Sequence, residues 1–167
     1  MKKIALIMLA VVSMALVSCG GGEKTITPTA TRFRGDLGSL VEVVDQPCTI
    51  TKVSKPTEQI ELKVKIELVG SDYEGYDPTE DFAFCGNLCL SVLLIDLEDE
   101  NGNTIGEAEL RKSDQRRMLD FLTKPFGTTD DFVFICKQSW DVELSEKDFI
   151  NSIAHFTPTY TTDICED

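Results

Sequence analysis

The sequence predicts a mainly β domain, organised as two antiparallel sheets packed face to face, with two short helices. Three observations support this class. Apolar and charged residues alternate for nine positions from Ile60 to Leu68, which is typical of a strand with one buried face. The pair Asn101-Gly102, between two segments of strand-like composition, indicates a hairpin turn. A helical period occurs at residues 113–124, so helix is a minor component.

Six further segments of strand-like composition lie on either side of the alternating one. The segment 88–97 is almost continuously apolar, which fits a helix or a central strand. Its β-branched residues and the Asn101-Gly102 turn after it favour a strand. Hairpin connections imply antiparallel pairing, and two packed sheets bury the apolar faces. The predicted strands are 40–44, 48–53, 59–69, 88–97, 104–110, 132–137 and 156–164.

Two short helices are expected within the domain. The first covers residues 113–124, with Ser113 as its N-cap and Pro125 after its end. The second begins after Ser145, because the spacing from Ser145 to Asp148 is that of a capping box and apolar residues follow it.

The amino-terminal residues have the order of a secretory signal peptide. Lys2 and Lys3 provide positive charge, and the next 14 residues, Ile4 to Val17, are uncharged and almost all apolar. A helix that spans a membrane needs roughly 20 apolar residues. This shorter segment is therefore expected to be removed, together with the rest of residues 1–18.

The apolar segment ends in Leu16-Val17-Ser18-Cys19, where cysteine directly follows a small residue. This stretch resembles the lipobox of bacterial lipoproteins. In that family the cysteine thiol receives a diacylglyceryl group, the signal peptide is cleaved, and the new amino terminus is often acylated. The resemblance implies lipidation of Cys19, attachment to a membrane, and a place in the cell envelope on a periplasmic or surface face. The alternative is an ordinary secretory signal with an accidental cysteine.

Residues 19–36 are expected to form the lipidated end and a flexible tether, because glycine and threonine without apolar periodicity bury no core. Residues 37–167 then form one β-sandwich domain. With its anchor, tether and number of strands, the mature chain loosely resembles the small immunoglobulin-like (Ig-like) β-sandwich lipoproteins, which are largely without assigned activity. The resemblance implies an Ig-like sandwich, and no motif in the domain adds an activity.

The composition argues against several partners and chemistries. The chain has 29 acidic and 16 basic residues, a net charge of −13, so nucleic acid and anionic headgroups are repelled. His155 is the sole histidine, which disfavours a histidine-based catalytic centre or a zinc site. The acidic turn that begins at Asp99 lacks the EF-hand pattern. We therefore predict no cofactor, no bound metal and no nucleic-acid partner.

Five cysteines remain once Cys19 is lipidated, so at most two disulfides form and one thiol stays unpaired. Cys85 and Cys89 are spaced CxxxC rather than CxxC, which favours a structural role over a redox motif. Cys89 and Cys136 both lie in predicted apolar strands, so this pair is the first choice for a disulfide between the sheets. Other pairings stay open. The five residues are Cys48, Cys85, Cys89, Cys136 and Cys165.

The acidic, tyrosine-containing segment 70–81 is the candidate ligand-binding loop. Tyr73 and Tyr76 could stack on sugar rings or anchor a protein partner, and Glu74 and Asp77 could accept hydrogen bonds from hydroxyl groups. The alternative interpretation is a solvated acidic loop without a ligand.

Two hypotheses for the function follow. The first is a non-catalytic binding or assembly module on a lipid anchor, whose partner is an envelope protein or a glycan. The second is a carboxylate-dependent hydrolase or glycan-processing enzyme, for which Glu74 and Asp77 would have to face one cleft. The sequence contains no paired catalytic constellation, which favours the first hypothesis. The single tryptophan, Trp140, is expected to pack against the domain rather than to contact a ligand.

Overall fold

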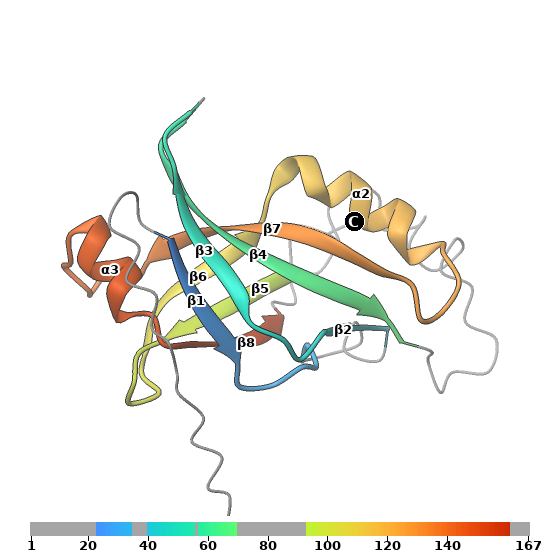
Figure 1. Cartoon of the computed structure of the whole chain (residues 1–167), viewed down its shortest axis with the longest axis horizontal. Helices are drawn as coiled ribbons and strands as arrows, with labels where there is room; N and C mark the ends of the chain where they lie inside the picture. Colours follow the sequence, from blue (N-terminus) through green and yellow to red (C-terminus); the bar gives the residue numbers. More distant parts are fainter. Residues whose placement is uncertain (1–22, 35–39, 56, 70–92, 161–167) are drawn as a thin grey trace, which may run out of the picture.

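A computed structural model describes residues 23–34, 40–55, 57–69 and 93–160 of the chain. Strands predominate in these residues, and two helices accompany them (Figure 1). None of the helices in the described ranges is long and apolar enough to cross a membrane. The elements are β1 (Glu23–Pro28), β2 (Val41–Val43), β3 (Cys48–Val53), β4 (Gln59–Leu68), β5 (Leu93–Glu98), β6 (Thr104–Leu110), α2 (Lys112–Leu122), β7 (Thr129–Gln138), α3 (Glu146–Ser152) and β8 (His155–Tyr160).

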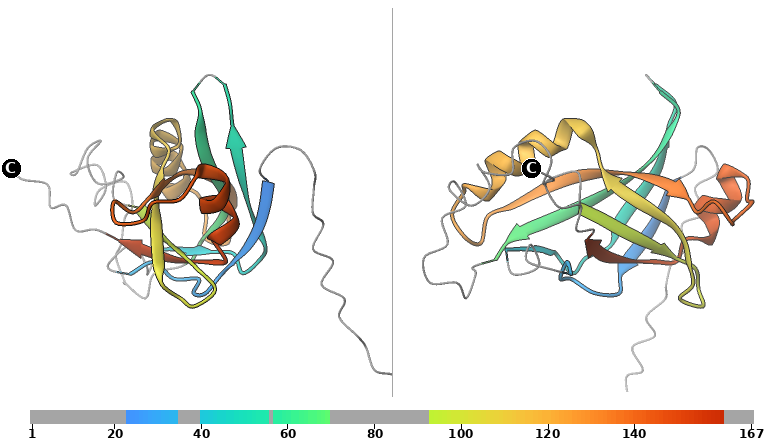
Figure 2. Two further views of the ribbon diagram at one scale, coloured as in Figure 1. Left: turned by 90° about the vertical axis from the view of Figure 1, so that its left-hand side faces the viewer. Right: turned by 180° about the vertical axis from the view of Figure 1, so that it is seen from behind.

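Seven of the described strands form a closed barrel (Figures 1 and 2). Their order is β4-β3-β1-β8-β5-β6-β7, and β7 pairs back onto β4. The pairing of β1 with β8 is parallel and the other pairings in the ring are antiparallel, so the barrel is mixed. The short strand β2 extends the same edge of β4 beyond β3. The predicted two-sheet, antiparallel Ig-like sandwich is therefore wrong.

Three pairings that the hydrophobic pattern does not reveal close the barrel. β4 and β7 pair over eight residues, from Ile60 opposite Cys136 to Glu67 opposite Thr129. β1 lies between β3 and β8 and pairs with both. Without β1, both β3 and β8 would have an edge of unpaired N–H and C=O groups. Alternation reveals which face of a strand is buried, but it does not reveal which strand is its neighbour.

The first barrel strand lies in the segment that was expected to be a flexible tether. Ile26 of β1 is buried, and Phe33 beyond it is 3% exposed. Arg32 forms an ion pair with Glu42 at 2.7 Å. The structure thus places a barrel strand, Glu23–Pro28, before residue 37, where the domain was expected to begin. A segment without apolar periodicity can still supply the backbone hydrogen bonds that two neighbouring edges require.

The interior of the barrel is a packed apolar core. The predicted alternation in β4 is confirmed, because its residues from Ile60 to Leu68 alternate between buried and more exposed positions. One end of the barrel is covered by α3 (Figure 2), whose Phe149 lies against Gly106 of β6. The largest fully buried side chains include five phenylalanines, which are Phe121, Phe132, Phe134, Phe149 and Phe156.

The predicted hairpin turn is confirmed as the connection between β5 and β6. Gly102 has a φ of 79°, a left-handed conformation that glycine adopts without steric cost. The carboxylate of Asp99 accepts hydrogen bonds from the backbone N–H groups of Asn101 at 2.8 Å and Asn103 at 2.9 Å. These bonds lower the pKa of Asp99, since the side-chain and backbone donors of Asn103 favour its charged form.

The two helices begin in different ways. Ser145 caps α3 as predicted, and its side chain accepts a hydrogen bond from the backbone N–H of Asp148 at 3.2 Å. The N-cap predicted for the other helix is wrong, because α2 begins one residue earlier and Ser113 lies inside it. Arg111 occupies the N-cap position of α2 without a capping bond from its side chain.

Candidate functional site

The residues that the sequence singled out fall mostly outside the described structure. Cys136 is an exception and lies in β7, where it is buried with a free thiol. Because its predicted partner is not described, the disulfide between Cys89 and Cys136 stays a prediction. The residues outside the described ranges are Cys19, Tyr73, Glu74, Tyr76, Asp77 and Cys89.

The two cysteines within the described residues have thiols that resist ionisation. Burial raises the pKa of the Cys136 thiol to about 12, and the nearby Glu61 carboxylate adds to the effect. Burial likewise raises the pKa of the Cys48 thiol to about 11. Since the thiolate is the reactive form of cysteine, neither thiol is activated as a nucleophile near neutral pH.

Asp114 in α2 is the one charged side chain that is buried among the described residues, with 2% exposure. Its carboxylate accepts hydrogen bonds from Arg117 at 2.9 Å, from Arg111 at 3.3 Å and from the backbone N–H of Val133 at 2.9 Å. These donors compensate for the cost of removing a carboxylate from water. The sequence analysis missed this cluster, although three-residue spacing places both arginines beside Asp114 on one helix face.

Arg117 extends the same cluster onto β7. Its guanidinium group pairs with Asp130 at 3.1 Å, donates to the backbone carbonyl of Asp131 at 2.8 Å and lies 5.1 Å from the centre of the Phe132 ring. The Phe132 ring in turn contacts Phe121 of α2 edge to face, with centroids 5.3 Å apart. The cluster therefore fastens α2 to the barrel, and its role is structural.

His155 lies at the start of β8, where the parallel pairing sets it beside Thr27 of β1. Its Nδ1 atom is 3.4 Å from the Thr27 hydroxyl oxygen, a long hydrogen bond. A histidine that acts as a general base needs a second group that orients its ring, usually a carboxylate. The hydrogen bond that His155 makes to Thr27 is with a neutral hydroxyl at the domain surface, and it joins two strands.

A group of carboxylates lies on the outer side of β5 and β6. Asp96 of β5 stands opposite Glu107 of β6 and near Glu98 on its own strand. Burial raises the pKa of Asp96, Arg34 opposes this shift, and Glu98 and Glu107 reinforce it. Glu98 itself accepts a hydrogen bond from the hydroxyl of Thr157 at 2.6 Å. These carboxylates are distributed over a convex wall, because the outside of a closed barrel curves away from its centre.

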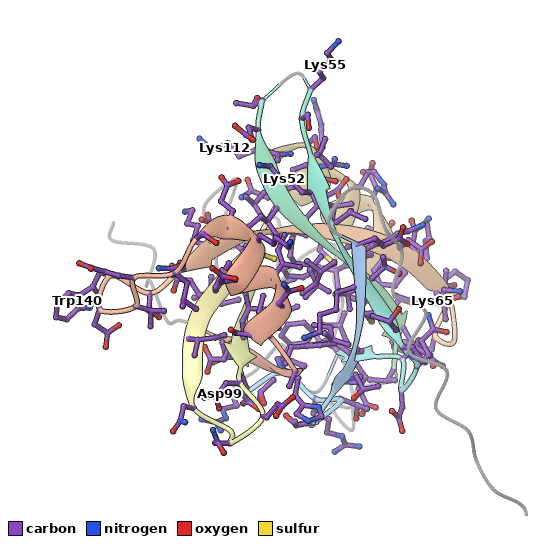
Figure 3. All side chains as sticks on the ribbon, turned by 60° about the vertical axis from the view of Figure 1, so that its left-hand side comes forward. Lys52, Lys55, Lys65, Asp99, Lys112 and Trp140 are labelled. Atoms are coloured by element: carbon purple, nitrogen blue, oxygen red, sulfur yellow. The ribbon has the colours of Figure 1, made fainter. Side chains whose placement is uncertain are left out.

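Trp140 is 95% exposed, so the expectation that it packs against the domain is wrong. It lies in the loop between β7 and α3 and projects away from the body of the molecule (Figure 3). Leu144 in the same loop is 40% exposed. Phe126 is 59% exposed in the loop between α2 and β7, before the opposite end of β7. Tryptophan is enriched among the side chains that dominate binding energies, so an exposed tryptophan is a candidate contact residue.

The loop that carries Trp140 is held in place at both ends. The backbone N–H of Ser139 donates to the carbonyl of Ile105 at 3.0 Å, and that of Val142 donates to the carbonyl of Ser139 at 3.1 Å. The side chain of Gln138 also donates to the carbonyl of Val142, whose side chain packs partly against the core. The turn therefore presents Trp140 in a fixed position.

Within residues 23–34, 40–55, 57–69 and 93–160, no group of three or more histidine, cysteine, aspartate or glutamate side chains is placed to hold a metal ion. Comparison of the chain with protein-family models, with curated proteins and with solved structures gave no match.

Proposed function

We propose that the chain is a bacterial cell-envelope lipoprotein whose barrel is a non-catalytic binding or assembly module. The observation that carries this proposal is the apolar core of the described residues, in which five phenylalanines are fully buried, together with the cover that α3 forms over one end of the barrel. Enzyme sites are usually concave pockets with a few convergent polar groups. A ligand of this barrel would instead meet its outer surface and loops.

The anchor rests on the Leu16-Val17-Ser18-Cys19 motif and its position after the apolar segment. Two or more acyl chains on Cys19 would hold the protein firmly at a membrane surface, whereas a single chain binds only marginally. Growth of cells with radioactive fatty acid tests this directly. Label should be incorporated by the wild type and lost in Cys19→Ser, and equal label in both would contradict lipidation at Cys19.

The partner proposed for the module is an envelope protein or a glycan that contacts the loop with Tyr73 and Tyr76. Purified peptidoglycan is a suitable glycan probe, used in co-sedimentation with the lipidated protein. For a protein partner, chemical crosslinking in intact cells is the corresponding experiment. Tyr73→Ala with Tyr76→Ala should abolish the association in either case, while Glu74→Gln with Asp77→Asn should weaken it only in part, since amides still form hydrogen bonds.

The alternative is a carboxylate-dependent hydrolase, and the raised pKa of Asp96 is the observation in its favour. Glycosidase carboxylates face each other across the sugar ring, about 5–10 Å apart. Asp96 and Glu107 instead lie side by side on a convex wall. Release of reducing sugar from peptidoglycan that disappears in Asp96→Asn, or in Glu74→Gln with Asp77→Asn, would support the hydrolase and contradict the binding module.

A further inference from the structure

We propose that the end of the barrel with α3 rests on a lipid bilayer with neutral headgroups, and that Trp140 and Leu144 enter its interface. This inference rests on the proposed lipidation of Cys19 and deepens it, because it assigns the face of the domain that meets the membrane. The two side chains are 95% and 40% exposed and lie in one loop. Tryptophan favours the boundary between lipid and water, since its ring is apolar and its N–H is polar.

The first argument is the position of the anchor. β1 begins at Glu23, only four residues after Cys19, and four extended residues span at most about 14 Å. The start of β1 lies beside α3 (Figures 1 and 2), because Lys24 donates a hydrogen bond to the carbonyl of Asn151 at 2.5 Å. α3 directly follows the loop with Trp140. The lipid on Cys19 is therefore tied to the same end of the barrel as Trp140.

The second argument is that the loop is preformed. Hydrogen bonds from Ser139, from Val142 and from the Gln138 side chain fix the turn before any contact with lipid. Insertion of Trp140 then requires little ordering of the chain, which is a main cost of binding for flexible segments. A weak contact of this kind would be effective, because the anchor already keeps the loop near the bilayer.

The third argument concerns the headgroups. Asp141 and Glu143 lie in the same loop as Trp140, and both are exposed. Their carboxylates would be repelled by anionic lipid and tolerated by zwitterionic lipid. Charge thus selects a neutral surface. A basic pocket in a protein or a sugar ring could also receive Trp140, but neither explains why the anchor leaves from the same end of the barrel.

The experiment uses the lipidated mature protein in phosphatidylcholine vesicles. Trp140 is the single tryptophan of the chain, so the fluorescence reports on this residue alone. In vesicles its emission should shift to the blue, quenching by acrylamide should fall several-fold relative to Cys19→Ser protein in buffer, and nitroxide-labelled lipid should quench it. If the mass of the protein shows that Cys19 is acylated but acrylamide still quenches Trp140 fully in vesicles, the docking inference is overturned and the anchor stays intact.

A matched control moves the tryptophan to the other end of the domain. In the double variant Trp140→Phe, Phe126→Trp the reporter lies before β7 instead of after it. Nitroxide-labelled lipid should not quench this variant, and equal quenching at both positions would show that no end is preferred. Protein without acyl mass on Cys19 would overturn the anchor and, with it, the docking.

The lipid composition provides an independent check. When part of the phosphatidylcholine is replaced with phosphatidylglycerol, acrylamide should quench Trp140 more strongly. In the double variant Asp141→Asn, Glu143→Gln, phosphatidylglycerol should not have this effect. Protection that increases with phosphatidylglycerol would contradict the charge argument. Protection of Trp140 by soluble peptidoglycan fragments without vesicles would assign the loop to a glycan and overturn the lipid contact.

Discussion

The two helices of the domain pack against the barrel in opposite ways. α2 buries a carboxylate, Asp114, and binds it with two arginines and a backbone N–H of β7. α3 has only apolar residues among its buried positions, and its charged contacts, such as the ion pair between Lys52 and Glu146, lie at the surface. The loop before α3 projects Trp140 into solvent. At the start of α2, by contrast, the Arg111 side chain donates a hydrogen bond to Asp114 of the same helix.

This difference suggests a division of roles between the two regions. Groups that are bonded within the chain, as around Asp114, contribute to stability and have little capacity left for a partner. Groups that the fold holds rigidly but leaves uncovered, as in the loop of Trp140, contribute little to stability and are free to bind. Substitutions in the two regions should therefore separate folding from binding.

Among the polar side chains, the largest effect is expected at Asp114. Asp114→Ala leaves the Val133 N–H without its partner and both arginines without their buried carboxylate, which should cost about 3 kcal/mol of unfolding free energy. The arginines are partly exposed and can regain water, which limits the loss. Urea denaturation measures it, with the exposed Asp141→Ala as the control, for which a change below about 0.5 kcal/mol is expected. Similar costs for both variants would contradict the buried cluster.

A smaller loss is expected where α3 meets the barrel. A Cβ on Gly106 would lie 2.5 Å from the Lys137 carbonyl oxygen and 2.7 Å from Cζ of Phe149. Gly106→Ala should therefore cost about 1–3 kcal/mol through overpacking, as measured by urea denaturation. Adding Phe149→Leu should recover part of the stability in a double-mutant cycle. Strict additivity of the two substitutions would show that Phe149 does not press on Gly106.

The helix caps give a closer comparison of the two regions. Ser145→Ala removes a hydrogen bond to the N–H of Asp148 and should cost about 1 kcal/mol. Ser113→Ala should change stability by less than about 0.5 kcal/mol, since Ser113 is exposed and lies inside α2. Thermal unfolding of both variants tests this prediction. A larger loss for Ser113 would mean that α2 begins where the sequence had indicated.

The smallest effect on stability is expected at Trp140. Because this side chain is 95% exposed, Trp140→Ala should change the unfolding free energy by less than about 0.5 kcal/mol. Phe149 is a buried aromatic residue at the same end of the barrel, and Phe149→Ala should lower the unfolding free energy by about 3–5 kcal/mol. A marked loss of stability in Trp140→Ala would show that the ring packs against the domain in solution.

Patterns that depend on neighbours in the chain were predicted well. The alternation at Ile60 to Leu68, the Asn101-Gly102 hairpin and the Ser145 cap are all present, since each depends on local contacts within a few residues. The β1 strand was missed because its sequence has no apolar period. Its position in the barrel is set by backbone pairing with the edges of β3 and β8. Strand partners depend on contacts between distant segments, which local patterns do not encode.

The same distinction between local patterns and distant contacts applies to the candidate sites. By itself the sequence determined the acidic composition and the alternating strand, and it predicted a lipobox at Cys19, because composition and spacing are enough for each. Only the tertiary structure decided that the sheet closes into a barrel, that Asp114 is buried and that Trp140 is exposed. Burial of a side chain depends on which distant element covers it. Asp114 lies beneath the contact of α2 with β7, and nothing in the described chain covers Trp140.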